Sequence, residues 1–175
     1  ALPSQLVVAV SGGVDSMAAL DFFRRRHDVS VAFFHHGTST SDAALQFVRD
    51  YCIEKAIDFS WKRMESARPA HKSQEEHWRD QRYAWLHSLP HTVVSAHHLN
   101  DCVETWIWSS LHGCGKLIPY QHGNVVRPLL LNTKAQLVKW CLHHDVPWRE
   151  DDSNLDVRYV RNLIRHELMP VALRV

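Results

Sequence analysis

The sequence predicts a doubly wound α/β domain, in which helices cover both faces of a parallel sheet. Short apolar runs alternate with segments of helical periodicity, which is the pattern of repeated strand–helix–strand units. The first apolar run passes directly into a Gly-Gly turn and then into a helical segment. The chain has 175 residues, 45% of them hydrophobic, which is enough for one domain with a buried core.

Each element follows from the local pattern. Four apolar runs predict strands at residues 6–10, 29–34, 57–61 and 92–96. Helical periodicity predicts helices at residues 17–26, 42–55, 74–89, 100–111, 133–144 and 157–168. Pro170 should end the last helix, residues 112–128 form a connection rich in Gly, Pro and His, and residues 150–154 form a polar turn. Ligands of such sheets bind beyond the carboxyl ends of the strands, so the chemistry is expected there.

A phosphate-binding loop is predicted between the first strand and the first helix. Its residues are Ser11, Gly12, Gly13, Val14, Asp15 and Ser16. The glycines allow close approach of a ligand, and the helix that follows offers free N–H groups and a positive dipole end. Asp15 can hold a magnesium ion against the phosphates. No Lys follows the glycines, so the common G-x-x-x-x-G-K-[ST] loop is absent. A plain Gly-Gly turn without a ligand is the alternative interpretation.

The string Ser-Gly-Gly-Val-Asp-Ser resembles the signature of the PP-loop family, the N-type ATP pyrophosphatases, which cleave ATP between the α- and β-phosphates. The resemblance implies a Rossmann-like fold of the adenine nucleotide alpha hydrolase type. It also implies ATP and Mg²⁺ as cofactors and one PP-loop domain over residues 1–175.

Further strings resemble one branch of that family, the tRNA(Ile)-lysidine synthetases. In chain order they are His36-Gly37, Glu75-x-x-x-Arg79-x-x-Arg82-Tyr83, Ala96-His97-His98-Leu99-Asn100-Asp101, Glu104-Thr105, Gly113-x-Gly115, Arg127-Pro128-Leu129-Leu130, Asp151-Asp152-Ser153-Asn154, Tyr159, Arg161-Asn162, Ile164-Arg165-His166 and Pro170. The resemblance implies that ATP adenylates the C2 carbonyl oxygen of a cytidine in a tRNA anticodon. The amine of L-lysine then displaces AMP.

The same resemblance implies roles for particular residues. The implied catalytic residues are Asp15, Arg79, Asp101 and Glu104, with Asp15 also the metal ligand. ATP binding is implied for residues 11–16 of the loop, for His36 and for His97. Binding of tRNA is implied for Arg82, His98, Arg127, Asn154, Arg161 and Arg165.

The residue spacing alone leaves alternatives open. Asp101 and Glu104 lie three apart on a predicted helix and share one face, which could also be a plain exposed face. Two helical segments carry arginines on one face, Arg79 with Arg82 and Arg158 with Arg161 and Arg165, which suit bidentate phosphate contacts and equally suit salt bridges on a solvated face. Zinc at His97-His98 is disfavoured because no cysteine lies near another with ligand spacing.

Composition limits the partners and the compartment. The net charge of +1 gives no general basic footprint, so RNA would bind to a local patch. Four cysteines without C-x-x-C spacing favour a reduced, cytoplasmic setting. No apolar run approaches twenty residues, which excludes a membrane span. A homodimer stays open.

Two departures from the branch bear on the function, and the first of them weakens the full transfer chemistry or indicates a changed substrate. His112 occupies the position before Gly113 where the family usually has Arg, and the chain stops soon after Pro170. We therefore expect the C-terminal tRNA-binding domains of the family to be absent, in a fragment or a minimal enzyme. Three other functions stay open: a tRNA thiolation enzyme, an amide-forming PP-loop ligase, and an ATP- or AMP-binding module without activity. For thiolation, Cys102 and Cys114 are a poor substitute for a paired cysteine motif.

Overall fold

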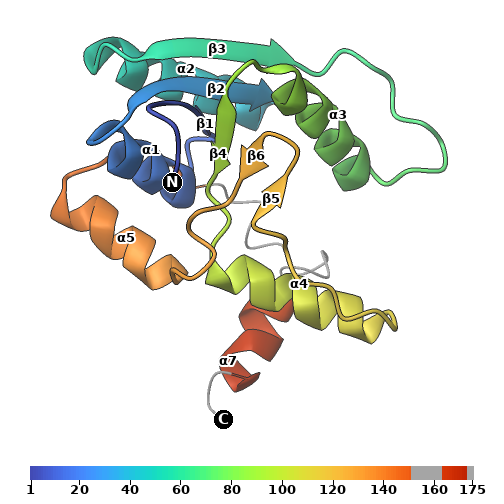
Figure 1. The fold of residues 1–175 in the computed structure, drawn as a ribbon. Helices are drawn as coiled ribbons and strands as arrows, with labels where there is room; N and C mark the ends of the chain where they lie inside the picture. Colours follow the sequence, from blue (N-terminus) through green and yellow to red (C-terminus); the bar gives the residue numbers. More distant parts are fainter. Residues whose placement is uncertain (151–162, 173–175) are drawn as a thin grey trace.

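The computed structural model describes residues 1–150 and 163–172 (Figure 1). One six-stranded sheet has the order β3-β2-β1-β4-β6-β5. Its strands are β1 Gln5–Ala9, β2 Asp28–His35, β3 Asp58–Arg63, β4 Thr92–Ser95, β5 Gln121–His122 and β6 Val125–Val126. All neighbours pair in parallel except β5 with β6. The predicted α/β class with a mainly parallel sheet is confirmed.

The helices connect these strands. They are α1 Val14–Arg24, α2 Ser39–Glu54, α3 Gln74–Ser88, α4 Leu99–Leu111, α5 Lys134–His143, the π-helix η2 Ile164–Leu168 and α7 Met169–Ala172. The helices α1 and α2 each begin three residues before the predicted position. For α2 the cause is Thr38, whose side chain accepts a hydrogen bond from the N–H of Ser41 and caps the helix.

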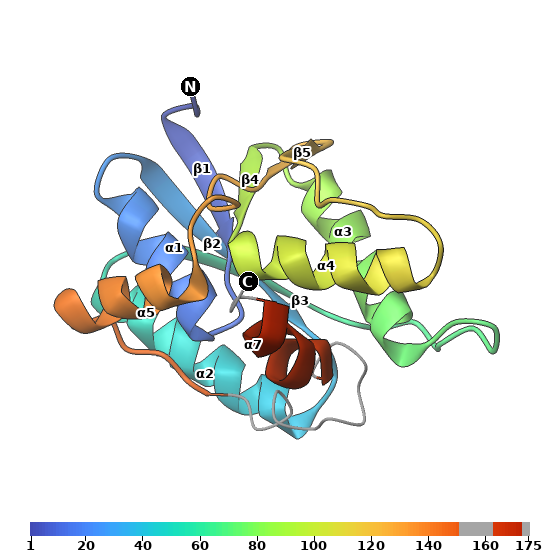
Figure 2. The ribbon, with the colours of Figure 1, turned by 90° about the horizontal axis from the view of Figure 1, so that it is seen from below.

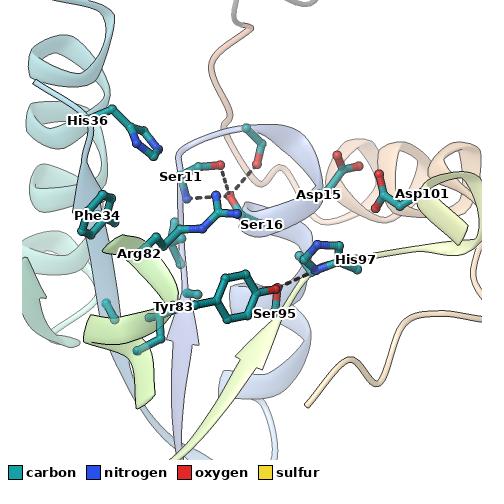
Figure 3. A pocket seen from close by; sticks show the side chains of 16 residues that line it. Ser11, Asp15, Ser16, Phe34, His36, Arg82, Tyr83, Ser95, His97 and Asp101 are labelled. Atoms are coloured by element: carbon teal, nitrogen blue, oxygen red, sulfur yellow. Dashed lines mark hydrogen bonds between the residues drawn. The ribbon is translucent and has the colours of Figure 1, made fainter. Parts of the chain in front are cut away.

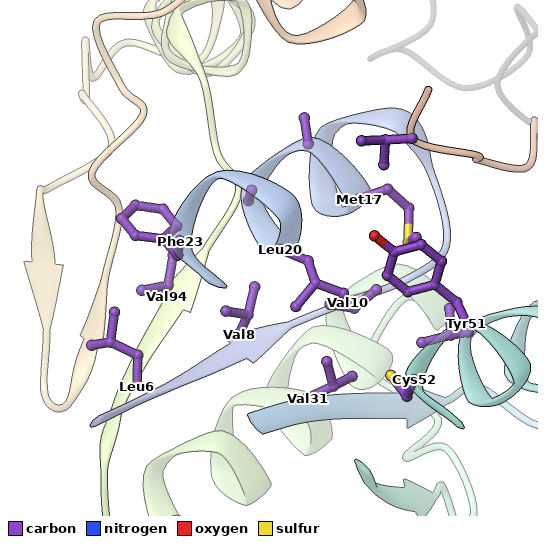
Figure 4. Packing of buried hydrophobic residues seen from close by; sticks show 14 of the residues in the cluster. Leu6, Val8, Val10, Met17, Leu20, Phe23, Val31, Tyr51, Cys52 and Val94 are labelled. Atoms are coloured by element: carbon purple, nitrogen blue, oxygen red, sulfur yellow. The ribbon is translucent and has the colours of Figure 1, made fainter. Parts of the chain in front are cut away.

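Alternate residues of β1 face two different layers, which makes the sheet doubly wound. Leu6 and Val8 belong to the buried cluster that includes residues of α1, α2 and α5, and Figure 4 shows Val8 facing Leu20 of α1. Val7 faces the opposite layer, where Leu86 of α3 belongs to the same buried cluster. Because side chains alternate along a strand, one apolar run can supply both cores.

A short hairpin lies in the Gly-, Pro- and His-rich connection predicted for residues 112–128. Strands β5 and β6 have two residues each, which is too short for any periodicity, and a Gly123-Asn124 loop joins them. Gly123 has a φ of +59°, as the first position of a two-residue hairpin loop requires. That Gly-Asn pair was a usable signal. The valines of β6 are buried beside β4, so the hairpin extends the sheet.

The prediction that the last helix ends at Pro170 is wrong. The π-helical turn η2 leads directly into α7, which continues to Ala172. In η2 the N–H of Met169 bonds to the carbonyl of Ile164, and Pro170 then falls in the first turn of α7, where a missing N–H costs least. The predicted helix start at residue 157 and most of the predicted turn lie outside the described residues.

The helix α4 extends beyond the end of β4, and α7 lies beside it in both views (Figures 1 and 2). In residues 1–150 and 163–172, no helix is both long enough and apolar enough to cross a membrane.

Candidate active site

The strand order brings three loops to one edge of the sheet. β1 lies between β2 and β4, with Ala9 opposite both Ala32 and Ser95. The three strands are parallel, so their carboxyl ends meet. The chain leaves β1 toward β2 and leaves β4 toward β6, which makes the gap between β1 and β4 the switch point of the sheet.

The loop after β1 is held open by its own hydrogen bonds. Gly12 has a φ of +90°, a conformation that favours glycine. The Ser16 hydroxyl donates to the Gly13 carbonyl at 2.9 Å and accepts from the Ser11 N–H at 3.1 Å. Gly13 precedes α1, and no side chain caps the helix. The first-turn N–H groups of α1 are therefore available to an anion.

A cavity of about 230 Å³ opens on one side of this loop and is called here the inner cavity (Figure 3). Its apolar wall comes from the sheet and from α3, and includes Ala9, Ala32, Phe34 and Leu86. Its polar wall comes from the loop, and Figure 3 shows Arg82 of α3 pointing toward that loop. A cavity with one apolar and one polar wall suits a nucleoside that carries phosphate.

A second cavity, of about 520 Å³, lies on the other side of the loop and is called here the cationic cavity. It shares Ser11, Gly13 and Asp15 with the inner cavity. Its cations come from separate elements: Lys134 begins α5, Arg149 follows that helix, and Arg165 lies in η2. The loop is thus a wall between an apolar space and a cationic one.

A third cavity, of about 490 Å³, is called here the outer cavity and lies between α3, α4 and the connection before β5. It shares Tyr83, His97 and Asp101 with the inner cavity. Arg79 and Lys116 supply positive charge, and Trp108 supplies an aromatic surface. This mixture suits an anionic partner with planar bases.

The three cavities meet at two carboxylates beside one histidine. His98 Nε2 lies 3.5 Å from Asp15 Oδ2, and His98 Nδ1 lies 3.6 Å from Asp101 Oδ2. Burial by itself would raise the pKa of Asp15, but the His98 hydrogen bond and nearby positive charges hold that pKa below its usual range. Burial raises the pKa of Asp101, and the charges of Glu104 and Asp15 add to the rise. The two acids therefore differ in protonation behaviour.

The residues present fit a magnesium ion. Asp15 Oδ1 is buried and has no hydrogen-bond partner in the part of the chain that the structure describes. That part contains no group of three or more His, Cys, Asp or Glu side chains arranged to hold a metal. Mg²⁺ does not need one, because it commonly binds one or two carboxylates together with substrate phosphates and water. Asp15 and Asp101 have the right donor chemistry.

Glu104 is buried, so the interpretation of an exposed acidic face does not hold for it. It is only 4% exposed and accepts two hydrogen bonds from Arg165, from Nε at 2.7 Å and from Nη2 at 2.9 Å. Two residues predicted for separate roles are thus bound to each other. The pair connects α4 to η2 beside the cationic cavity, which Arg165 lines.

Two histidines of the inner cavity have pKa values well below that of ordinary histidine, so they stay neutral at mildly acidic pH. Burial lowers the pKa of His97 to about 3, helped by Arg127, Arg82 and Arg79, and its Nδ1 lies 2.7 Å from the Ser95 hydroxyl. Burial lowers the pKa of His36 to about 4, and its Nδ1 has no partner among the described residues. Neutral imidazoles leave the positive charge of this cavity to arginine.

Three guanidinium groups lie beside the ring of Tyr83. Arg79, Arg82 and Arg127 lie 5.6, 5.7 and 5.8 Å from the centre of its ring. Arg127 also donates to the Tyr83 hydroxyl at 2.9 Å and to the Pro119 carbonyl at 2.7 Å. Arg127 is 3% exposed and lines the outer cavity, and His98 is also 3% exposed, so their contacts with tRNA stay predictions. Both have partners inside the protein.

The other predicted residues lie in different parts of the site. Arg82 lines the inner cavity and Arg79 the outer one, the reverse of what their assignment to tRNA and to catalysis suggested. His112 is exposed at the end of α4, where its Nδ1 lies 2.7 Å from the Trp108 carbonyl. Asn154 and Arg161 lie outside the described residues.

The sequence did not indicate that Lys134 and Arg149 line the cationic cavity, or that Tyr83 lines both the inner and the outer cavity. A signal existed for Lys134, because the capping box of Thr133 with Gln136 marks the start of α5 and places Lys134 at its first position. For Arg149, nothing in the local sequence indicates that its N–H donates to the Gly12 carbonyl at 2.9 Å.

A loop of this geometry at the switch point of a parallel sheet, with three cavities meeting at it, defines a nucleotide-binding α/β domain. The family model described as the PP-loop domain matches residues 2–172, and the chain belongs to this family.

The curated relatives that match this chain are named tRNA(Ile)-lysidine synthase. The tRNA(Ile)-lysidine synthase of Chlorobaculum tepidum is 35% identical over 95% of this chain and 56% of its own length. That of Azoarcus sp. is 34% identical over 96% of this chain and 41% of its own length. The chain therefore spans about half the length of these relatives.

Solved structures share the fold at low identity. The NH3-dependent NAD synthetase from Campylobacter jejuni has a TM-score of 0.59 at 13% identity, covering 93% of this chain and 78% of that one. The NMN synthetase from Francisella tularensis has a TM-score of 0.57 at 12% identity, covering 93% and 77%. The predicted Rossmann-like PP-loop fold is confirmed.

Proposed function

We propose that this chain binds Mg-ATP and adenylates the C2 carbonyl oxygen of a cytidine in a tRNA anticodon, to which L-lysine is then joined. Similarity to relatives named tRNA(Ile)-lysidine synthase over nearly the whole chain supports this choice. The observation that carries it is the arrangement of the cavities: the loop is shared by the inner and cationic cavities, and Asp101 is shared by the inner and outer cavities.

This arrangement gives ATP one orientation. The nucleoside fills the inner cavity against Phe34 and Leu86, and the β- and γ-phosphates cross the loop into the cationic cavity. The α-phosphate then lies against the loop N–H groups, close to Asp15. When bound there, magnesium would neutralise phosphate charge, and Asp15 is the residue to hold it.

The acceptor base enters from the outer cavity. Its O2 attacks the α-phosphorus, the bond to the bridging oxygen of the β-phosphate breaks, and pyrophosphate leaves on the cationic side. Attacking and leaving oxygens are then roughly in line, as phosphoryl-group displacements require. The lysine amine next attacks C2, loses a proton and expels AMP. Asp101 offers a carboxylate to this amine where the outer cavity begins, and Glu104, which lines the same cavity, is held by Arg165.

The arginines divide between the two steps by position. Arg82 faces the loop and is placed to stabilise charge on the α-phosphate, whereas Arg79 lines the outer cavity and is placed to contact the RNA. This division reverses the roles that the sequence resemblance implied for the two residues. Arg165, bound to Glu104 and lining the cationic cavity, is placed to support both acid and phosphate.

Thiolation has less support. Burial raises the pKa of the Cys102 thiol, with a contribution from Asp101, whereas a reactive thiolate needs a lowered pKa. Cys114 is exposed beyond the end of α4. The solved synthetase structures share the fold alone at 12–13% identity, so they give no support to an amide-forming reaction here. A cytoplasmic location and a homodimer stay predictions.

The test is pyrophosphate release from ATP by this chain, with bulk tRNA and each candidate amine added in turn, followed by mass analysis of the tRNA nucleosides. We expect repeated turnover of ATP that needs both tRNA and lysine, with tRNA alone giving at most one equivalent of pyrophosphate, and with the mass of lysine gained on cytidine. Release with tRNA but without a lysine product would point to thiolation or another amine. No release, with AMP still bound, would point to a nucleotide-binding module.

A further inference from the structure

The cationic cavity contains a lysine that no part of the loop signature provides. We propose that Lys134, with Arg149, forms a binding site for the pyrophosphate group of the nucleotide, both as the β- and γ-phosphates of ATP and as the released product. This inference rests only on the ATP-cleaving half of the proposed function.

The position of Lys134 is fixed by the fold. It is the first residue of α5, and its backbone N–H donates to the side-chain oxygen of Asn100 at 2.9 Å. Thr133 caps the same helix end. The contact with Asn100 ties the start of α5 to the start of α4, so the lysine is held at the cavity by two helices.

The ammonium group of Lys134 is available. Within residues 1–150 and 163–172 it makes no hydrogen bond and no ion pair with a side chain, although the residue is half-buried. Its positive charge acts on the loop electrostatically, since it adds to the effect of His98 in lowering the pKa of Asp15. A half-buried cation that has no carboxylate partner among the described residues, in the same cavity as a loop of open N–H groups, is a site for an anion.

Arg149 brings a second cation to the same cavity. Its backbone N–H donates to the Gly12 carbonyl, so its main chain is attached to the loop. Its guanidinium is exposed and lines the cavity, and Glu150 lines it too. Arg165 is also present, but Glu104 already holds two of its donors. Lys134 and Arg149 therefore supply the charge that a bound anion would meet.

The chemistry needs this charge at this place. When the bond between the α-phosphorus and the bridging oxygen breaks, the electron pair stays on pyrophosphate. In the common nucleoside-triphosphate loop, a lysine within the loop contacts the β- and γ-phosphates and neutralises this charge. This loop has none, and α5 supplies one from another part of the chain.

The test uses calorimetric titration of the whole chain with inorganic pyrophosphate, ATP and AMP, each with magnesium. Lys134→Met should weaken binding of pyrophosphate and ATP by about tenfold or more, as expected for a lost charge-assisted hydrogen bond. AMP has no β- or γ-phosphate, so its affinity should not change. Lys139 is an exposed lysine on the same helix, and Lys139→Met serves as the control. It should leave all three affinities unchanged.

Equal pyrophosphate binding by wild type and Lys134→Met would overturn the proposal. So would an equal loss of AMP and ATP affinity, or a wild type that binds no pyrophosphate. Lys134→Arg keeps the charge and should restore binding, which guards against a folding defect in the Met variant. The two proposals can fail separately. If no lysidine forms but Lys134→Met still loses pyrophosphate affinity selectively, the acceptor chemistry is rejected and this binding site is retained.

Discussion

Arg165 holds Glu104 with two parallel hydrogen bonds, at 2.7 and 2.9 Å, across 61 residues of sequence. The Glu104 carboxylate is almost fully buried, whereas the Arg165 side chain keeps 28% exposure. A carboxylate so buried depends on its partner, because removing one member leaves an uncompensated charge. The pair also joins η2 to α4 at the boundary of the proposed site.

Glu104→Gln should destabilise the fold because it keeps the shape of the side chain but leaves Arg165 without its counter-charge. We expect a loss of about 3 kcal/mol in the free energy of unfolding, measured by urea denaturation. Glu167→Gln is the matched control, an exposed residue of η2, and should change stability by no more than about 0.5 kcal/mol. A loss for Glu104→Gln as small as the control would contradict the structural role.

Asp15→Asn should abolish pyrophosphate release and leave the fold intact, because the amide cannot supply the negative charge that holds magnesium. A loss of about 100-fold or more in rate is expected, of the size seen when a stabilising group is removed from a transition state. Asp58→Asn, an exposed aspartate at the start of β3, serves as the control and should keep the wild-type rate. Unchanged release by Asp15→Asn, with the same melting temperature as wild type, would end the magnesium role.

Tyr83→Phe should separate the ring from the hydroxyl. The ring stays beside the three guanidinium groups, but Arg127 loses one acceptor at a buried position, which costs about 1–3 kcal/mol of stability. Tyr83→Leu also removes the ring and should in addition raise the KM for ATP, because Arg82 loses its aromatic support. Urea denaturation and steady-state kinetics measure the two effects. An identical KM in both variants would show that the ring does not position Arg82.

The fold class and the loop could be predicted because their signals are local. An apolar run before a Gly-Gly pair specifies a strand, a turn and a helix without reference to the rest of the chain. His36 and His97 could be placed in one site because parallel strands end at one edge. Both line the inner cavity.

The partners of the charged residues could not be predicted, because they depend on packing between distant elements. The spacing of Asp101 and Glu104 correctly indicates one helix face, but nothing near Glu104 in the sequence shows that Arg165 will reach it. Lys134 and Arg127 have the same difficulty, since their neighbours come from other elements. The hairpin β5–β6 was not predicted for a different reason: strands of two residues are too short to show an alternating hydrophobic pattern.

The low pKa values of His97 and His36 make stability depend on pH. In the folded chain these pKa values are about 3 and about 4, whereas an unfolded chain protonates histidine near its ordinary value of 6.5. Between about pH 4 and 6.5 the unfolded state therefore binds more protons than the folded state. Stability falls as the pH falls through this window, by up to about 1.4 kcal/mol per pH unit for each histidine.

His97→Gln removes one of these two groups and should flatten the dependence. The variant loses its bond to Ser95 and some stability at all pH values, but the slope of unfolding free energy between about pH 4.5 and 6 should fall by about 1.4 kcal/mol per pH unit. Urea denaturation across that range measures the slope. His91→Gln, an exposed histidine before β4, should leave the slope as in wild type. Parallel curves for His97→Gln and wild type would mean that His97 is protonated in the folded chain, and that burial and the arginines around Tyr83 do not hold it neutral.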